Sequence, residues 1–145
     1  MTILNPAPIA FDYAGLWPMV DIAVLNQAEA ETLTGEVDIG AAIAALRNRG
    51  VGKVVLTLGP GGALVLEGKR PQHVPAEAVT AVDTTGAGDV LVGVLAAAID
   101  RGLPLIPAVC WAVAAASKKV TRRGTSSGFP TTEELAVLAS AMALP

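Results

Sequence analysis

The chain has 145 residues, of which 52% are hydrophobic and 16% are charged, and its formal net charge is −3 at pH 7. This length suits one globular domain with a real core. The negative charge argues against nucleic acid or an anionic membrane as a partner, because binding either one requires clustered lysines and arginines. Cys110 is the one cysteine and can form no internal disulfide, so we expect a reducing, cytoplasmic compartment. Charged residues and prolines interrupt the most apolar region, 90–117, so we expect no membrane-spanning helix.

Apolar runs and segments with helical spacing alternate along the first half of the chain. Short apolar runs predict strands, and they cover 1–4, 21–26, 53–59 and 62–68. Helical segments are expected over 12–18, 27–35 and 38–50. Pro18 should stop the first of these helices, and a glycine ends each of the other two.

The second half of the chain is mainly helical. An extended segment, 72–83, should precede helices over 87–100, 105–121 and 131–143. Thr131 or Thr132 is suited to cap the last helix. Strands separated by helices predict an α/β fold with a largely parallel sheet covered by helices. In such sheets ligands bind beyond the carboxyl ends of the strands, so the loops that follow strands are the candidate sites.

The stretch "VDTTGAGD" places Gly86, Ala87, Gly88 and Asp89 at the expected start of a helix. The first amide groups of a helix have no intrahelical acceptor, and glycines let a ligand approach them closely. The turn is therefore suited to bind an anion such as phosphate. A carboxylate beside a transferring phosphoryl group could also accept the proton of an attacking hydroxyl. The alternative is a structural glycine turn in which Asp89 complements the helix dipole.

Two further loops carry polar or small residues. Asn26 and Glu29 are three positions apart at a helix start, and they could hold Mg²⁺ through its waters. The alternative is an asparagine cap followed by a helix-favouring glutamate. The loop "TLGPGG", 57–62, would let a flat base or a ribose approach its backbone, although a plain turn between two strands is the alternative.

Other routes to catalysis find little support in the sequence. There is no Walker motif, so the P-loop route to ATP is excluded. His73 is the single histidine and is expected at the surface. The basic run 118–123 ends a helix, and the helix dipole explains it without a ligand. Contact of Arg122 or Arg123 with a phosphate stays open.

Several motifs in this order resemble the ribokinase, or phosphofructokinase-B, family of carbohydrate kinases. They are "LNPAP", "LNQAEAETLTG", "VVLTLGPGGALV", "VDTTGAGD" and "VTRRGTSSGFPT". The resemblance covers nearly the whole chain, and the ribokinase members of the family are the most similar. It implies a three-layer ribokinase-like fold and ATP-dependent phosphorylation of a sugar hydroxyl.

The resemblance also implies roles for individual residues. Asp89 would be the catalytic base, Gly86, Ala87 and Gly88 the anion hole, and Asn26 and Glu29 the residues that order magnesium and phosphates. The adenosine site would be lined by Thr57, Leu58, Gly59, Pro60, Gly61 and Gly62. A monovalent cation, K⁺, would bind mostly through carbonyls of Asp83, Thr85, Lys119, Arg122, Gly124 and Gly128. Gly128 departs from the usual serine and removes a hydroxyl from that cation site.

Members of this family are much longer, and the chain resembles their C-terminal half. The resemblance places most sugar contacts in an N-terminal half, so the chain should bind ATP or ADP and act on a sugar only with that half. A non-catalytic nucleotide-binding remnant or interaction module is the alternative. An uncovered sheet edge also leads us to expect self-association as a homo-oligomer.

Overall fold

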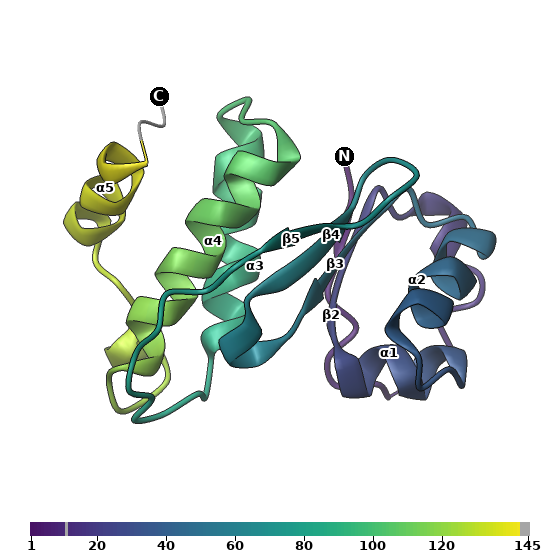
Figure 1. Ribbon diagram of the computed structural model, residues 1–145, viewed down its shortest axis with the longest axis horizontal. Helices are drawn as coiled ribbons and strands as arrows, with labels where there is room; N and C mark the ends of the chain where they lie inside the picture. Colours follow the sequence, from purple (N-terminus) through teal and green to yellow (C-terminus); the bar gives the residue numbers. More distant parts are fainter. Residues whose placement is uncertain (11, 143–145) are drawn as a thin grey trace. The chain divides into compact units, whose positions relative to one another are not determined.

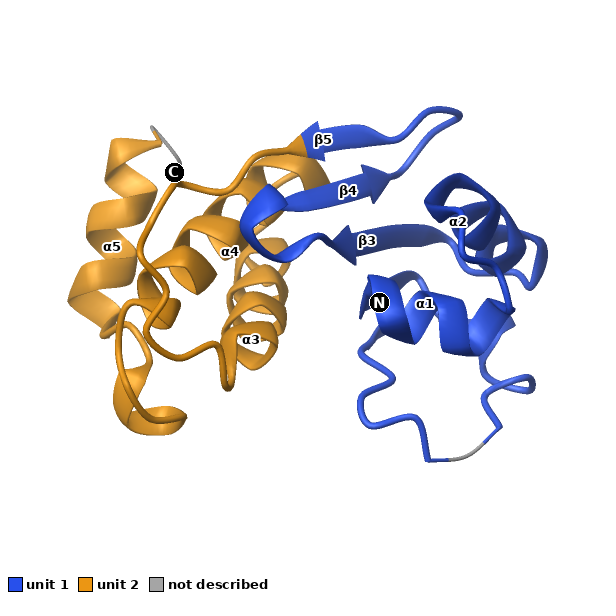
Figure 2. Cartoon of the chain, turned by 60° about the horizontal axis from the view of Figure 1, so that its bottom comes forward, with its two compact units in different colours: residues 1–73 blue, residues 74–145 orange. Residues whose placement is uncertain are grey.

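The computed structural model describes residues 1–10 and 12–142, and it divides at His73 into two compact units (Figure 2). The first unit contains most of the strands, and the second contains the longer helices. The strands are β1 Ile3–Leu4, β2 Ile22–Asn26, β3 Lys53–Thr57, β4 Ala63–Leu66 and β5 Gln72–Val74. The α-helices are α1 Gln27–Thr34, α2 Ile39–Asn48, α3 Ala87–Asp100, α4 Leu105–Val120 and α5 Thr132–Ala141 (Figure 1). That both units belong to one domain stays a prediction.

The strands form one mixed sheet in the order β1-β2-β3-β4-β5. Strands β1, β2 and β3 are parallel, whereas β4 runs antiparallel to β3. The parallel register pairs Asn26 with Thr57, the last residues of β2 and β3. Because parallel strands end at the same edge of a sheet, the segments that follow β2 and β3 begin next to each other.

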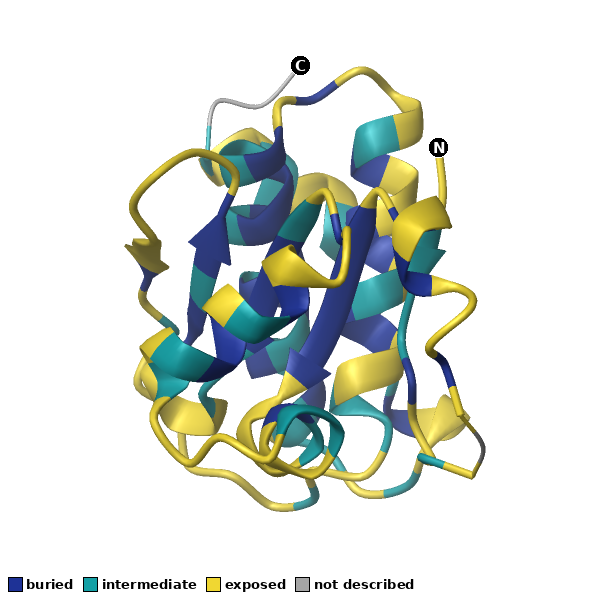
Figure 3. Ribbon diagram, turned by 90° about the vertical axis from the view of Figure 1, so that its right-hand side faces the viewer, coloured by how far each residue is buried: buried dark blue, intermediate teal, exposed yellow. Residues whose placement is uncertain are grey.

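The core of the first unit forms where β2 and β3 meet α1 and α2. Both strands are buried apolar runs, and Figure 3 shows buried residues along strands of the sheet and on helices beside it. Leu46 of α2 and Leu56 of β3 belong to the same buried cluster, each with 0% exposure. Burial of a leucine side chain stabilises the fold by roughly 1.5–3 kcal/mol, so these contacts hold the helices against the strands.

The helix predicted over 12–18 is wrong, and the structure has a 3₁₀ turn at Trp17–Met19 instead. Pro18 lies in the first positions of that turn, where its missing N–H is tolerated. Tyr13 and Trp17 both point into the core, with ring centroids 5.7 Å apart. The burial of these two aromatic rings therefore determines the backbone conformation of the segment, and helical propensity does not.

In the second unit, α3 and α4 pack against each other along an apolar face. Ala98 of α3 and Ala108, Ala112 and Ala115 of α4 are completely buried, and their small side chains allow a close approach. Trp111 joins α4 to α5, because its indole Nε1 donates to the Leu135 carbonyl at 3.1 Å.

The helices of the second unit follow the predicted positions closely. The three helices begin within one residue of the predicted starts, and the last predicted residue of α5, 143, lies outside the described residues. Among the residues that the structure describes, no helix has the length and apolar character needed to cross a membrane.

Candidate nucleotide and catalytic site

The start of α3 has the backbone geometry that the sequence predicts for an anion site. Gly86 is the N-cap residue and has a left-handed conformation, with φ of 80°. The Ala87 amide donates to the Thr84 carbonyl at 3.1 Å, which closes the turn before the helix. The Gly88 and Asp89 amides are the next two, and helix geometry provides no intrahelical acceptor for them. An approaching anion would therefore meet these two amides.

The two glycines of this turn have different surroundings. A Cβ atom added at Gly86 would lie 2.9 Å from Thr125 Cγ2 and 3.0 Å from Phe129 Cε1. A Cβ atom added at Gly88 would meet nothing within 4 Å. Gly86 is therefore required by backbone conformation and packing, whereas Gly88 faces open space that a ligand could use.

Asp89 is the third residue of α3 and is exposed. A carboxylate in the first turn of a helix interacts favourably with the helix dipole, so the structural alternative accounts for its position equally well. Exposure beside an open glycine is what a general base needs to reach a substrate hydroxyl.

Asn26 and Glu29 form a reciprocal capping box at the start of α1. The Glu29 amide donates to Asn26 Oδ1, and the Asn26 amide donates to Glu29 Oε2, both at 2.9 Å. This is the capping role that the sequence left open as an alternative to Mg²⁺ binding. Glu29 Oε1 takes no part in the box. Since Mg²⁺ keeps most of its waters and needs few protein oxygens, Glu29 could cap the helix and also hold Mg²⁺.

The loop 57–62 makes a tight 3₁₀ turn at Gly59–Gly61 between β3 and β4. The Leu58 amide donates to the Gly62 carbonyl at 2.8 Å, and the turn has exposed backbone at Gly59, Pro60 and Gly61. His73 is exposed as predicted, but its Nε2 lies 2.6 Å from the Gly61 carbonyl oxygen. Sequence reasoning missed this contact, because nothing in the spacing of residues 61 and 73 indicates it.

Asp83 holds the turn before α3 against the loop after α4. The Thr85 amide donates to Asp83 Oδ1 at 2.9 Å, and the Gly124 amide donates to Oδ2 at 2.8 Å. The Val120 carbonyl accepts from the Asp83 amide at 3.1 Å. Hydrogen bonds from Thr85 and then from Gly124, together with the Lys119 charge, lower the pKa of Asp83 to about 2.

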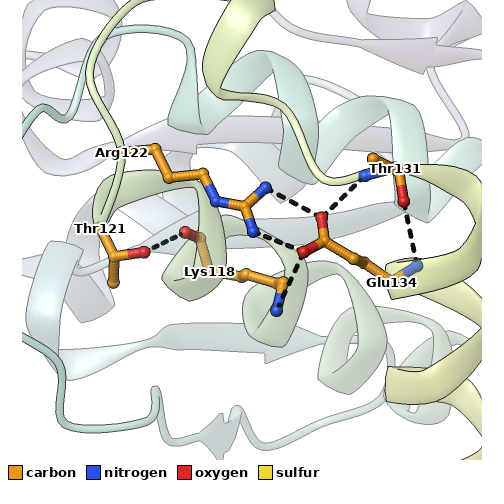
Figure 4. A network of polar contacts seen from close by, with 5 residues as sticks. All are labelled: Lys118, Thr121, Arg122, Thr131 and Glu134. Carbon is orange, nitrogen blue, oxygen red and sulfur yellow. Dashed lines mark hydrogen bonds and ion pairs between the residues drawn. The ribbon is translucent and has the colours of Figure 1, made fainter.

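Arg122 forms a bidentate ion pair with Glu134, the third residue of α5 (Figure 4). Its two terminal nitrogens lie 2.9 and 2.5 Å from Glu134 Oε2 and Oε1, and Lys118 Nζ lies 3.4 Å from Oε1. The hydrogen bonds from Arg122 lower the pKa of Glu134 to about 2. Glu134 also completes a capping box with Thr131, one of the two threonines predicted as the cap of α5. In this structure Arg122 binds a carboxylate of its own chain, and the exposed Arg123 does not take part in the network.

The lowered pKa values of Asp83 and Glu134 predict that the chain loses folding stability over a defined acidic pH range. The pKa of Asp83 falls from 3.8 to about 2, and that of Glu134 falls from 4.5 to about 2. A lowered folded-state pKa contributes stability that is present above the unfolded value and is lost as pH falls through the folded value. We expect the melting temperature to decline between about pH 4.5 and pH 2, and to decline less steeply in Glu134→Gln. Melting curves by circular dichroism across this range test the prediction, and equal slopes for the two proteins would contradict it.

Lys119 is completely buried, and its Nζ lies where the resemblance implies a potassium ion. Nζ donates to the Asp83 carbonyl at 2.8 Å and, more weakly, to the Arg122 carbonyl at 3.4 Å. Two unit positive charges about 4 Å apart repel each other by roughly 4 kcal/mol at an effective dielectric constant near 20. The residues present therefore do not fit a potassium ion on these carbonyls.

Comparison with known proteins identifies the family of this chain. The model of the pfkB family of carbohydrate kinases matches residues 1–132. The chain is 38% identical over 144 residues to a ribokinase of Mus musculus. This match covers 92% of this chain and 45% of the mouse protein.

Solved structures give the same result. The crystal structure of a ribokinase from Thermotoga maritima superposes with a TM-score of 0.90 at 34% identity, covering 95% of this chain and 48% of that one. A ribokinase of Arabidopsis thaliana, complexed with ribose and ATP, gives a TM-score of 0.81 at 30% identity, covering 94% and 46%.

The chain belongs to the pfkB family of carbohydrate kinases. The ribokinase-like α/β fold predicted from the sequence is confirmed. The chain spans about half the length of the curated relatives it matches, 45% of the mouse protein. That this is the C-terminal half stays a prediction, which rests on the order of the motifs.

Proposed function

We propose that this chain carries the ATP site and the catalytic base of a sugar kinase, and that it phosphorylates a sugar hydroxyl together with a second half of the protein. One observation supports the proposal above the others. Asp89 is exposed in the first turn of α3, beside the open position Gly88 and directly after the left-handed Gly86. A phosphoryl-transfer site needs this combination of free amides, close approach and a nearby carboxylate.

In the proposed reaction Asp89 accepts the proton of a sugar hydroxyl. The hydroxyl oxygen forms a bond to the γ-phosphorus of ATP, the bond from that phosphorus to the β–γ bridging oxygen breaks, and ADP leaves. The Gly88 and Asp89 amides would stabilise the negative charge on the phosphoryl oxygens. A carboxylate can serve as this base, because in a loose transition state the proton transfers late.

The residues at the ends of β2 and β3 would serve the nucleotide. Bound Mg²⁺ would neutralise the charge of the phosphates. Glu29 would hold the ion through Oε1 or through its waters, while the capping box with Asn26 keeps the glutamate in place. The loop 57–62 would accept the adenosine against its exposed backbone. We do not extend the proposal to potassium, because the Lys119 ammonium already binds the Asp83 carbonyl.

The remaining parts of the proposal concern partners. The sugar would bind only with the second half, and the chain alone would bind ATP or ADP without useful turnover, because positioning of the acceptor supplies much of the catalysis. Self-association is proposed because β1 ends the sheet order and leaves an edge for pairing. A cytoplasmic location is proposed from the cysteine content.

Nucleotide binding by the chain as given tests the proposal. We expect weak, magnesium-dependent binding of ADP in isothermal titration calorimetry. Gly88→Ala should weaken this binding by about tenfold, because a methyl group enters the approach to the free amides. It should leave the melting temperature unchanged or slightly higher, since alanine favours helix over glycine by about 1 kcal/mol.

Gly93→Ala is the matched control for this experiment. Gly93 lies later in the same helix, and a Cβ atom there also meets nothing within 4 Å. It should gain the same helix stability and bind ADP like the parent chain. Equal ADP affinity in both variants, or no ADP binding by the parent chain, would contradict the proposed site. Binding in the parent chain without sugar-dependent ADP release after addition of the second half would favour the non-catalytic alternative.

A further inference from the structure

The ammonium of Lys119 is a buried charge inside the second unit. Lys119 has 0% exposure. Burial of a charged group is costly unless the group is paired and hydrogen-bonded. Nζ meets that requirement with two carbonyl oxygens, those of Asp83 and Arg122. No buried side-chain nitrogen or oxygen within the described ranges lacks a hydrogen-bond partner.

The two carbonyls belong to segments far apart in the sequence. Asp83 opens the turn that leads to Gly86 and α3, and Arg122 lies in the loop that follows α4. The same two segments are joined by the hydrogen bond from the Gly124 amide to Asp83 Oδ2, at 2.8 Å. The lysine therefore lies at the junction that positions the start of α3.

We propose that the Lys119 ammonium takes the place of a monovalent cation at this junction, so that the chain orders the turn before α3 with a charge of its own. The ammonium carries the same single positive charge as K⁺ and binds the same kind of ligand, backbone carbonyl oxygens. It is delivered by a side chain on a helix, so its position does not depend on the ion composition of the solvent.

A second observation agrees with this assignment. Gly128 is buried and supplies no side-chain oxygen to the junction. A Cβ atom there would lie 3.2 Å from the Arg123 carbonyl oxygen, so a larger residue would be crowded. Both positions thus agree with an ammonium in this place, because Lys119 supplies a positive charge and Gly128 offers no side-chain oxygen for a further ion.

The competing explanation is that Lys119 is an ordinary buried lysine whose only role is to fill space. The two explanations differ in what happens when the charge is removed. If Lys119 substitutes for an ion, a small side chain at this position should open room for K⁺, and K⁺ should restore the lost stability. If Lys119 only fills space, no particular cation should compensate for its loss.

The experiment compares melting temperatures of the chain in KCl and in tetramethylammonium chloride at equal ionic strength. We expect the parent chain to melt at the same temperature in both salts. Lys119→Ala should melt roughly 5–10 °C lower in tetramethylammonium chloride, the scale of losing a buried hydrogen-bonded charge in a domain of this size. KCl should restore about half of that loss or more.

Two matched variants complete the design. Lys119→Met fills the space without a charge, and it should melt at a lowered temperature in both salts. Lys118→Ala removes the neighbouring lysine, whose Nζ pairs with Glu134 at 3.4 Å, and it should show no difference between the salts.

The result that would overturn the proposal is a parent chain that KCl stabilises, or a Lys119→Ala variant that KCl does not rescue. Should Lys119→Ala fail to fold in tetramethylammonium chloride, folding in KCl becomes the readout, and failure to fold in both salts also overturns the proposal. No nucleotide is present in this experiment. Its failure and the failure of the proposed kinase function are therefore distinguishable.

Discussion

Replacing Asp89 with asparagine should lower kcat for sugar phosphorylation by at least about 100-fold, the scale of losing a general base. The activity would be measured in a chain completed with the sugar-binding half of the family, as sugar-dependent release of ADP. Asparagine keeps the size of the side chain and its place in the first turn of α3, but it cannot accept the proton of the attacking hydroxyl. The affinity for ATP should change little, because the free amides at the start of α3 remain.

Asp100→Asn is the matched control for this prediction. It makes the same chemical change at the last residue of the same helix, where Asp100 is exposed. This control should retain nearly full kcat. If Asp89→Asn also retained near-normal turnover, Asp89 would have no part in the chemistry, and the structural role beside the helix dipole would be the better explanation.

Gly86→Ala should be the most destabilising substitution in the glycine turn. Alanine at φ of 80° is strained, and its Cβ atom would lie 2.9 Å from Thr125 Cγ2 and 3.0 Å from Phe129 Cε1. The backbone conformation costs roughly 1–2 kcal/mol, and crowding in a packed site adds roughly 1–3 kcal/mol. For a domain of this size the melting temperature should fall by roughly 6–15 °C.

Gly102→Ala separates the two contributions to this loss. Gly102 follows α3 with φ of 84°, but a Cβ atom there meets nothing within 4 Å. It should lose the backbone contribution alone, so its melting temperature should fall by less than half as much. Equal losses in the two variants would show that Thr125 and Phe129 move aside, and that packing against the 125–129 segment does not restrict Gly86.

The sequence carries the local features of this molecule in patterns of adjacent or near-adjacent residues. Asn26 and Thr131 were predicted as possible caps, and each forms a capping box with a glutamate three residues later. The glycine turn before Asp89 was recognised for the same reason, since a left-handed residue and a helix start involve only a few consecutive positions. The motif order was enough to indicate the family.

The sequence also indicates which segments become strands and helices, because an element that is buried on one face or on both has a characteristic pattern of apolar residues. The buried runs of β2 and β3 and the helical spacing of α2 are examples. The segment 12–18 departs from this rule. Its aromatic rings gain more by entering the core than the backbone gains by completing a helix, and that balance depends on neighbours elsewhere in the chain.

Contacts between distant residues were decided only by the tertiary structure. The basic run 118–123 looks uniform in sequence, yet Lys119 is buried on the Asp83 carbonyl while Lys118 and Arg122 pair with Glu134. Helix geometry turns adjacent residues about 100° apart, so neighbouring lysines face different surroundings. Which carbonyl or carboxylate each one meets depends on how α4 packs against segments 12 to 36 positions away. No local sequence pattern determines which partner each basic side chain contacts. The free energy that favours one partner over another comes from burial and ion pairing in the folded unit.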